Sequence, residues 1–550
     1  MAFAITQTCC NDASCVSVCP VNCIHPTPGE PDFGTTEMLY IDPRTCIDCG
    51  ACADACPVDA VLPLDQLSGP NEVYADLNRQ YYERRETSPS WDEPSFPRPL
   101  PQDEAPKRVA IVGTGPAASY TAELVLRTTN AEVTLIDRLP VAGGLVRYGV
   151  APDHPSTKRI ADGFSWLYQH PRLRVHMNVE VGRDVTHEEL AAHHHAVFYG
   201  VGAGADRSLG VPGEDLRGSL SATRFVAWYN AHPDVPAAGV DLSSERAVVV
   251  GNGNVALDVA RILLGDPDQL ARTDIADHAL EALRTSKVRE VVLLARRGPE
   301  HAAYTSPEFL ALQHLPGVQV VVDDHPRARE AIENAEPDSK AALLAGIPVE
   351  QVDWPAPPPE GKRIVLRFWG SPTEIAGDEQ VRAVRVQDNV ESAAAEIPTG
   401  LVVRSIGYRN RPVPGLPFDE RAATVPNDGG RVTDEHGTPV PGSYVVGWIK
   451  RGPSGGIGTN RSCAQETVDA FLDDATARRL PDPAATAKEF TKLVRRRKPE
   501  AVGRKEMLAI DRAERERGRD AQRPRVKFAT VSDLLGAAKR NPLSRLAKRK

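Results

Sequence analysis

Cysteine is almost absent from the greater part of this 550-residue chain. Nine of the ten cysteines lie before residue 57, and only Cys463 comes later. A disulfide framework would show no fixed tight spacing, whereas such clustering indicates metal ligands in a reducing compartment. The sequence therefore predicts a metal-binding segment near the N-terminus.

The sequence also lacks a long apolar run and a charged-then-apolar leader. No stretch approaches the roughly 20 apolar residues that a membrane helix needs. The first six residues do not begin a signal peptide. We therefore expect a cytoplasmic protein without a membrane span. Its length and ordinary composition suffice for three or four domains with sizeable cores.

Basic residues are scarce in 1–80, which hold eleven acids and two arginines, a net charge equal to the −9 of the whole chain. The last part is basic, for example in 495–498 and 545–550, but acids such as Glu514 are interleaved there. No nucleic-acid-binding motif accompanies these bases, so we expect no nucleic-acid partner. We interpret them as a solvated face, or as a surface complementary to an acidic redox partner.

The N-terminal cysteines form a bacterial iron–sulfur motif. The run from Cys46 to Pro57 has the pattern C-x2-C-x2-C-x3-C-P. In such a run the first three cysteines hold one cluster and the fourth holds the other. A zinc site would more often show two separated C-x2-C pairs. The spacing therefore predicts iron–sulfur clusters.

The first twenty residues repeat this run, with Asp12 where a cysteine is expected. The repeat predicts two clusters with crossed ligands. One cluster, of the 4Fe–4S type, would be held by Cys19, Cys46, Cys49 and Cys52. The other would be held by Cys9, Cys15 and Cys56, with Asp12 as a possible fourth ligand.

A carboxylate binds iron less tightly than a thiolate does here, so the second set of ligands favours either a 3Fe–4S cluster or an Asp-ligated 4Fe–4S cluster. A solvated loop position for Asp12 is equally open. Cys10 and Cys23 fall outside the register of the repeat and are interpreted as buried thiols without a ligand role. Residues 1–62 thus form a small cluster domain. Residues 63–106 would contain a short docking helix and a linker whose six prolines between 89 and 106 exclude a helix.

A dinucleotide-binding unit follows the linker. The strand 108–112 leads into a G-x-G-x-x-A turn and a helix, and the next strand ends at Asp137. Gly113 makes the tight turn, and Gly115 lets the backbone approach a pyrophosphate at the start of the helix. Asp137 lies at the right distance to accept hydrogen bonds from ribose hydroxyls.

A second such unit begins with the strand 246–250 and the turn from Gly251 to Ala256. Its next strand, 290–294, ends not in an acid but in Arg296 and Arg297. Arginines at this position pair with the 2′-phosphate of NADP. The long gap between turn and arginines predicts an inserted helix over 274–286.

Two dinucleotide units in one chain indicate a flavoprotein, in which the first unit holds FAD and the second brings a nicotinamide to it. We expect the FAD domain in 107–206 and again in 409–550, with the NADP domain in 207–408. A later glycine-rich loop, 452–460, precedes a helix and suits phosphate or flavin contact through backbone N–H groups.

Three segments carry a family resemblance: 145–155, 251–261 and 447–453. They resemble the signatures of adrenodoxin reductase-type ferredoxin–NADP reductases. With its N-terminal cluster domain, the whole chain resembles the fused ferredoxin/ferredoxin–NADP reductases of actinobacteria. The resemblance implies an α/β fold with two Rossmann-like domains of the adrenodoxin/glutathione reductase type. A small α+β bacterial ferredoxin domain would precede them.

The resemblance also places cofactor contacts. With the motif glycines, the FAD contacts would be Gly113, Gly115, Ala117, Asp137, Leu145, Val179, Trp448, Gly455, Gly456 and Ile457. The NADP contacts would be Arg207, Asn252, Gly253, Asn254, Val255, Arg296, Arg297, Glu308 and Gly455. His154 lies in the first signature and is open to two interpretations, tuning of hydride transfer or a packed histidine.

These expectations describe a ferredoxin–NADP reductase. NADPH gives a hydride to FAD, and single electrons pass through the clusters to an external redox protein, such as a monooxygenase or another ferredoxin-dependent enzyme. A second hypothesis is an electron-feeding subunit, like the small subunit of glutamate synthase. A third is an iron–sulfur sensor with degenerate nucleotide domains, which the intact glycine turns disfavour.

Overall fold

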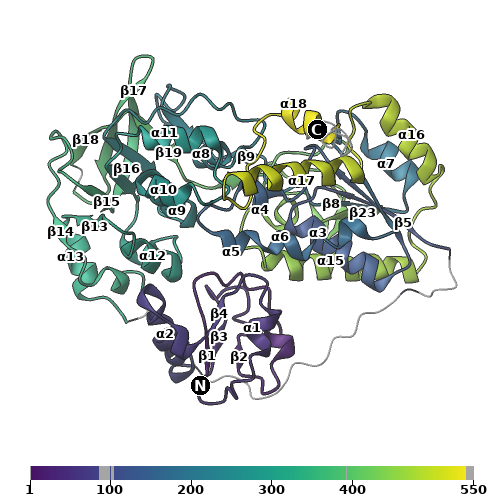
Figure 1. Ribbon diagram of the computed structural model, residues 1–550, viewed down its shortest axis with the longest axis horizontal. Coiled ribbons are helices and arrows are strands. Elements are labelled where there is room, and N and C mark those ends of the chain that lie inside the picture. The colour runs from purple at the N-terminus through teal and green to yellow at the C-terminus, as the bar shows by residue number, and fades with distance from the viewer. Residues whose placement is uncertain (1, 86–99, 101–104, 338, 392, 540–550) are drawn as a thin grey trace, which may run out of the picture.

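The computed structural model describes residues 2–85, 100, 105–337, 339–391 and 393–539. These residues form a small N-terminal domain below two larger α/β domains that lie side by side (Figure 1). Most of the predicted proline-dense linker is outside the described residues. Among the described helices, none is both long and apolar enough to cross a membrane.

The N-terminal domain is built from two short antiparallel β-pairs and two helices. Its strands are β1 (Phe3–Ile5), β2 (Ile24–His25), β3 (Tyr40–Ile41) and β4 (Val61–Pro63), and its helices are α1 (Ala51–Ala55) and α2 (Val73–Glu83). β1 pairs with β4, and β2 pairs with β3. The buried Asn78 of α2 accepts hydrogen bonds from the backbone N–H groups of Ile5 (3.1 Å) and Ile41 (2.9 Å). This one side chain therefore fastens the helix to both β-pairs.

The first large domain has a seven-stranded sheet in the order β21-β22-β23-β8-β5-β6-β7. The strands are β5 (Arg108–Val112), β6 (Glu132–Asp137), β7 (Leu173–Met177), β8 (Ala196–Tyr199), β21 (Asn427–Asp428), β22 (Arg431–Thr433) and β23 (Pro439–Val445). From β23 to β7 all pairs are parallel. The near-continuous apolar sequence of β5 and β8 fits strands that are covered on both faces.

Helices cover both faces of this sheet. They are α3 (Pro116–Thr128), α4 (Gly144–Tyr148), α5 (Pro155–Lys158), α6 (Ile160–Gly163), α7 (His187–His193), α14 (Trp448–Arg451), α15 (Thr459–Thr476), α16 (Ala487–Arg497), α17 (Arg504–Asp520) and α18 (Val531–Ala538). Two of them begin with a capping box, formed by Thr186 with Glu189 and by Thr486 with Glu489. Most of the described residues after 470 lie in the helices α15 to α18.

The second large domain has a seven-stranded, wholly parallel sheet in the order β10-β19-β11-β12-β15-β13-β14. Its strands are β10 (Ser219–Ser221), β11 (Arg246–Val250), β12 (Glu290–Leu294), β13 (Val318–Asp323), β14 (Val349–Glu350), β15 (Lys362–Arg367) and β19 (Leu401–Arg404). Its helices are α8 (Ala222–Tyr229), α9 (Asn254–Leu264), α10 (Pro267–Leu270), α11 (Asp277–Arg284), α12 (Ser306–Gln313) and α13 (Pro326–Glu333). The predicted inserted helix corresponds to α11.

A three-stranded antiparallel sheet extends the second domain, and a two-stranded ribbon joins it to the first. The sheet consists of β16 (Gly370–Gly377), β17 (Val381–Asp388) and β18 (Ala394–Pro398). The ribbon pairs β9 (Ala205–Asp206) with β20 (Tyr408–Arg409), so the chain leaves the first domain and returns to it at one place. The expected fold class, with two Rossmann-like domains behind a small α+β domain, is confirmed.

The C-terminal region packs on the first domain through buried ion pairs. Arg147 of α4 donates two hydrogen bonds to the fully buried carboxylate of Glu514 in α17, at 2.6 and 2.7 Å. Farther on, the buried ammonium group of Lys527 lies 2.8 Å from Asp274, which also binds Lys158 at 2.9 Å. Burial lowers the pKa of Lys527 despite this carboxylate. Lys527, in the segment between α17 and α18, thus contacts residues of both large domains.

Candidate functional site

The first glycine turn brings three backbone segments together at the start of α3. Gly113 has φ +105°, and a Cβ there would lie 2.3 Å from the carbonyl oxygen of Gly200. A Cβ on Gly144 would lie 2.8 Å from the Cα of Gly115. A Cβ on Gly447 would meet the side chain of Ala117. This glycine-lined backbone leaves the N–H groups at the helix start accessible, which suits a pyrophosphate.

Asp137 lies at the end of β6, close to this turn. Its carboxylate accepts hydrogen bonds from the hydroxyl of Thr114 (2.6 Å) and from the backbone N–H of Leu139 (2.9 Å). Burial raises the pKa of Asp137 although both bonds favour the charged form. Val179 is beside it, because its N–H donates to the Asp137 carbonyl at 2.9 Å. These residues suit the adenosine end of a dinucleotide.

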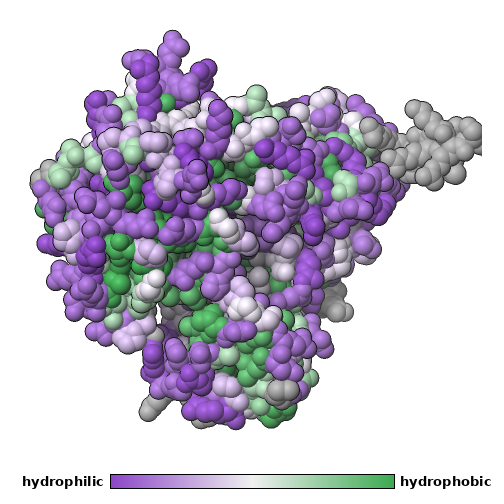
Figure 2. Space-filling model, turned by 60° about the vertical axis from the view of Figure 1, so that its left-hand side comes forward, coloured by the Kyte–Doolittle hydropathy of each residue, from purple (hydrophilic) through white to green (hydrophobic). Residues whose placement is uncertain are grey.

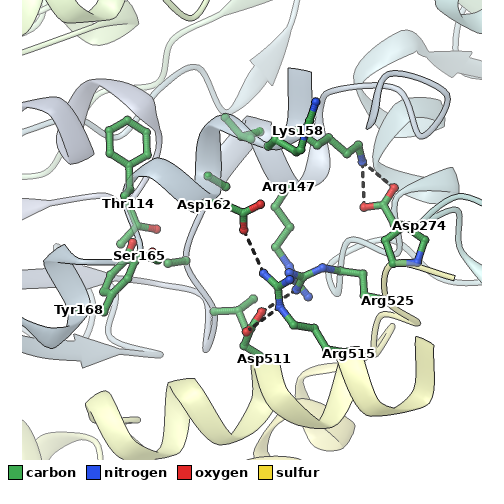
Figure 3. Close-up of a pocket in the computed structure, with 18 of the residues that line it drawn as sticks. Thr114, Arg147, Lys158, Asp162, Ser165, Tyr168, Asp274, Asp511, Arg515 and Arg525 are labelled. Carbon is green, nitrogen blue, oxygen red and sulfur yellow. Dashed lines mark hydrogen bonds and ion pairs between the residues drawn. The ribbon is translucent and has the colours of Figure 1, made fainter. Parts of the chain in front are cut away.

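A cavity of about 710 Å³ opens next to the turn. Thr114, Gly143 and Val146 are on its wall, together with apolar residues of α6 and α17, whereas none of the predicted FAD contacts lines it. In Figure 3, Asp511 of α17 lies between two arginines, and Lys158 reaches Asp274 at the other end. The volume lies within the range of pockets for drug-sized ligands and cofactors. The cavity therefore adjoins the predicted flavin region without coinciding with it.

The predicted flavin contacts near the C-terminus form one loop before α15. The indole N–H of Trp448 donates to the carbonyl of Ser454 at 3.1 Å, and its ring lies 5.1 Å from that of Tyr408. Gly455 and Gly456 are exposed, and Gly455 has φ +76°. The loop thus presents backbone groups at the boundary between the two large domains.

The second glycine turn leads into α9 in the same way. A Cβ on Gly251 would lie 2.2 Å from the carbonyl oxygen of Ser405, so only glycine fits there. The side-chain amide of Asn254 donates to the hydroxyl of Thr305 (3.2 Å) and accepts from the Thr305 N–H (2.8 Å). Asn252 accepts from the N–H of Ala303 at 3.4 Å. Two predicted NADP contacts therefore already fix a neighbouring loop.

The predicted NADP arginines are exposed at the edge of the second sheet. Arg296 and Arg297 follow β12, at the position where the second strand of such a unit meets the ribose. Their backbone is held by Asn389, which donates to the carbonyl of Arg296 at 2.6 Å. Arg207, next to β9, is also exposed. All three side chains are accessible to a phosphate.

His154 and Glu308 belong to a half-buried charge cluster around the buried Arg261 of α9. Arg261 binds Asp153 (2.8 Å), Asp258 (2.6 Å) and Glu308 (3.2 Å), and it contacts the ring of His154. Burial and Arg261 lower the pKa of His154, but the carboxylates of Asp258 and Glu308 outweigh them and raise it. His154, Asp258 and Glu308 could together ligate a metal ion. The guanidinium of Arg261 already provides a positive charge beside these three groups.

The predicted cluster ligands separate into the two expected sets. Cys9, Cys15, Cys56 and Asp12 surround one small cavity, and Cys10 is also on its wall. Ala60 donates its backbone N–H to the sulfur of Cys56 at 3.2 Å. Burial raises the pKa of the Cys9 thiol to about 11, which disfavours the thiolate form. A bound metal cation would offset this effect because it stabilises thiolates.

The second set lies around Cys19. A hydrogen bond between the sulfurs of Cys19 and Cys23 (3.4 Å) lowers the pKa of Cys19 to about 5. Cys46 and Cys52 are partly or fully buried, but Cys49 is exposed. Cys23 thus lies beside the predicted ligands, and the thiols together offer the soft donors that iron–sulfur clusters need.

Sequence reasoning missed the residues that dock the small domain. Asp12 is bound by Arg461 of α15, whose guanidinium also donates to Ser14 at 2.7 Å. Glu37 accepts the backbone N–H of Ser306 at 2.7 Å and forms an ion pair with Lys340. Three further contacts are the Asp59–Arg159 ion pair, a hydrogen bond from Gln7 to Glu308 (3.1 Å), and one from the Gly458 N–H to the Cys10 carbonyl (2.9 Å). The only sequence signal was the acidity of 1–80.

Comparison with known proteins agrees with this geometry. Residues 8–60 and 38–90 match models of the 4Fe-4S dicluster domain, and residues 107–298 match the pyridine nucleotide-disulphide oxidoreductase family. The M. tuberculosis FprA structure in complex with NADPH has 42% sequence identity and a TM-score of 0.71, and the match covers 79% of this chain and all of FprA. The fold and the site thus define a nucleotide-linked flavoprotein oxidoreductase fused to an iron–sulfur domain.

Full-length relatives give the family. A probable ferredoxin/ferredoxin–NADP reductase of Mycobacterium bovis is 48% identical, with the alignment covering 100% of this chain and 97% of the relative. The M. leprae relative of the same name is 46% identical over 99% of both chains. The chain belongs to the ferredoxin/ferredoxin–NADP reductase family. It is an oxidoreductase with FAD, NADP and iron–sulfur sites in one polypeptide.

Proposed function

We propose that the chain passes electrons from NADPH through its own ferredoxin domain to an external redox protein. NADPH would lie across the second glycine turn, where Arg296 and Arg297 pair with its 2′-phosphate. Because a phosphate can accept two charge-assisted hydrogen bonds from each guanidinium, these arginines select NADPH over NADH. Asn252 and Asn254 hold the turn against the 303–305 loop, so the binding surface is formed in advance.

The residues of the first unit would hold FAD. The glycine-lined backbone around α3 would receive the pyrophosphate, and Asp137, which already accepts a hydrogen bond from Thr114, would accept the ribose hydroxyls. When bound, FAD takes up a hydride and gives out electrons one at a time, which is the conversion that one-electron iron centres need. No side-chain nucleophile is required. The glycine loop 455–457 and Trp448 would border the flavin ring.

The contact between the first cluster loop and this glycine loop carries the proposal. Gly458 donates its N–H to the carbonyl of Cys10, which adjoins the predicted ligand Cys9, at 2.9 Å. A Cβ on Gly458 would collide with Cys10 and Asn11 at 2.3 Å. The small domain is therefore seated on the loop that would border the flavin, which supports electron transfer within one chain.

We infer a three-iron cluster at this first site. Asp12 occupies the fourth ligand position of the repeat, but its carboxylate is bound by Ser14 and lies 3.5 Å from Arg461. A carboxylate that is already bound by other partners is a weak fourth ligand for a cluster held by three thiolates. The second site keeps four cysteines and would hold a four-iron cluster. Electron paramagnetic resonance of the oxidised protein distinguishes the two types.

Cutting the tether between the domains tests the proposed function. A protease site is placed within 86–99, and cluster and flavin absorbance are followed separately after anaerobic mixing with NADPH. Tethering gives an effective concentration of about 1 mM, so cutting and diluting to micromolar protein should slow cluster reduction by about tenfold to a hundredfold. Flavin reduction should keep its rate, and the uncut variant is the control. Equal cluster reduction in cut and uncut protein would refute the tethered route.

A further inference from the structure

Among the described residues, the small domain contacts the reductase through the side that faces the two large domains. That side carries the first cluster loop, with Asp12 on Arg461, Glu37 on Lys340 and Asp59 on Arg159. Each of these three ion pairs joins an acid of the small domain to a base of the larger domains. The intramolecular interface therefore follows the charge pattern of a redox pair, acidic on the ferredoxin and basic on its partner.

The second set of cysteines is at an exposed apolar surface instead. Within the described residues, three large hydrophobic side chains are classed as exposed, and two of them flank this set. Val18 is 41% exposed and precedes Cys19, while Ile47 is 58% exposed and follows Cys46. Cys49 is exposed as well. Figure 2 shows such apolar surface on the small domain, at the bottom of the view, among hydrophilic neighbours.

The surroundings of this surface are acidic. Asp48 and Asp54 are exposed beside it, and residues 1–80 carry a net charge of −9. Apolar centres with a charged rim are typical of protein interfaces, and the charge of the rim steers association. The surface formed by Val18, Ile47, Asp48 and Cys49 is called the exit face below.

We propose that the exit face is where the external acceptor docks, and that this acceptor is a redox protein with a basic rim around an apolar centre. The inference rests on the proposed function and adds the order of the clusters, the first set facing the flavin and the second set facing the partner. One NADPH releases two electrons and a proton. Each turnover therefore reduces two acceptor molecules by one electron each, in two successive encounters.

Substitutions on the exit face test this proposal with cytochrome c as the probe, because it is a basic one-electron haem protein. Ile47→Lys and, in the other cysteine run, Val18→Lys each remove an apolar contact and add a repelling charge. Either should lower NADPH-driven cytochrome c reduction about fivefold to tenfold, as the loss of a central interface residue does. Iron content and the anaerobic bleaching of the clusters by NADPH should stay unchanged.

Asp76→Lys is the matched control. Asp76 is an exposed acid on α2, on the other side of the small domain from α1, and its substitution changes the charge even more (Figure 1). It should leave cytochrome c reduction within about twofold of the parent, since a charge outside the interface contributes little. Reduction of ferricyanide, a small anion that needs no docking, should be equal in all variants.

Three results would overturn the proposal. They are unchanged cytochrome c reduction in both exit-face variants, an equal loss in Asp76→Lys, or an equal loss with ferricyanide. Failure of the proposed function gives a different result, because NADPH would then not bleach the clusters of the unmodified protein. A variant that loses iron is replaced by the other exit-face variant, since Val18 and Ile47 lie in separate segments.

Discussion

The two dinucleotide-binding units share a strand, a glycine turn and a helix, yet they differ in how far the charges near the predicted nucleotide are exposed. In the first unit the decisive charges are buried: Asp137 is bound by Thr114, and Arg147 is bound by Glu514 beneath the C-terminal helices. In the second unit Arg296 and Arg297 are exposed at the end of β12. The comparison teaches that one backbone motif can serve either retention or exchange of a nucleotide, depending on what covers it.

The largest effect is expected where buried charge is removed. Glu514→Gln leaves Arg147 buried without its carboxylate and leaves Arg525 with Asp511 alone, which should lower the free energy of unfolding by about 3–5 kcal/mol. Chemical denaturation followed by flavin release measures it. Asp520→Asn, at the exposed end of the same helix, should change stability by less than about 0.5 kcal/mol. A small effect of Glu514→Gln would show that the C-terminal helices do not hold the first unit closed.

The second effect concerns affinity rather than stability. Replacing both Arg296 and Arg297 with alanine should raise the KM for NADPH about a hundredfold, because two charge-assisted hydrogen bonding groups are lost. The KM for NADH and the kcat should change little, so the preference for NADPH falls. Arg289→Ala, at the other end of the same strand, is the control. A parallel rise in both KM values would point to a damaged domain.

The smallest effect tests whether the second unit also contains a buried charge that matters. Burial alone would raise the pKa of Glu214, but hydrogen bonds from Ser208, Leu209, Gly210 and Arg404 lower it to about 2. A carboxyl whose pKa is lowered in the folded state stabilises the fold at any pH above its ordinary pKa. This contribution is lost as the pH falls to the pKa of the folded state.

Glu214→Gln should therefore cost about 1–3 kcal/mol at pH 7 and nearly nothing at pH 2. Denaturation midpoints from pH 7 to pH 2 measure the difference. The parent should lose more stability than the variant between pH 5 and pH 2. If both lose the same amount, Glu214 is not the source of the acid-dependent stability.

The fold could be predicted from the sequence because its signals are local. The two glycine turns, the strands around them and the C-x2-C-x2-C-x3-C-P run each lie within a few dozen residues. The docking contacts could not be predicted, because Gln7 meets Glu308 and Glu37 meets Lys340 across some 300 positions. A single surface ion pair has no sequence motif, because its two partners come together only when the domains pack against each other.

The candidate site shows the same division. The cysteine repeat indicated two groups of cysteines, and the strand ends indicated Asp137 and the two arginines; their roles as ligands and nucleotide contacts stay predictions. Nothing in the sequence indicated that Arg261 would gather His154, Asp258 and Glu308 into one cluster. For that reason the two interpretations of His154 could be weighed only after its neighbours were known.

The small domain touches both halves of the reductase at once. Asp12 binds Arg461 on the FAD side, whereas Glu37 binds Lys340 on the NADP side, and the chain crosses between the two halves at the narrow β9–β20 ribbon. Any rotation of the NADP half about that ribbon must stretch one of these two anchors. The small domain thus also restrains the two halves relative to each other. Nucleotide exchange that requires such a rotation would weaken the contacts that hold the small domain on the reductase.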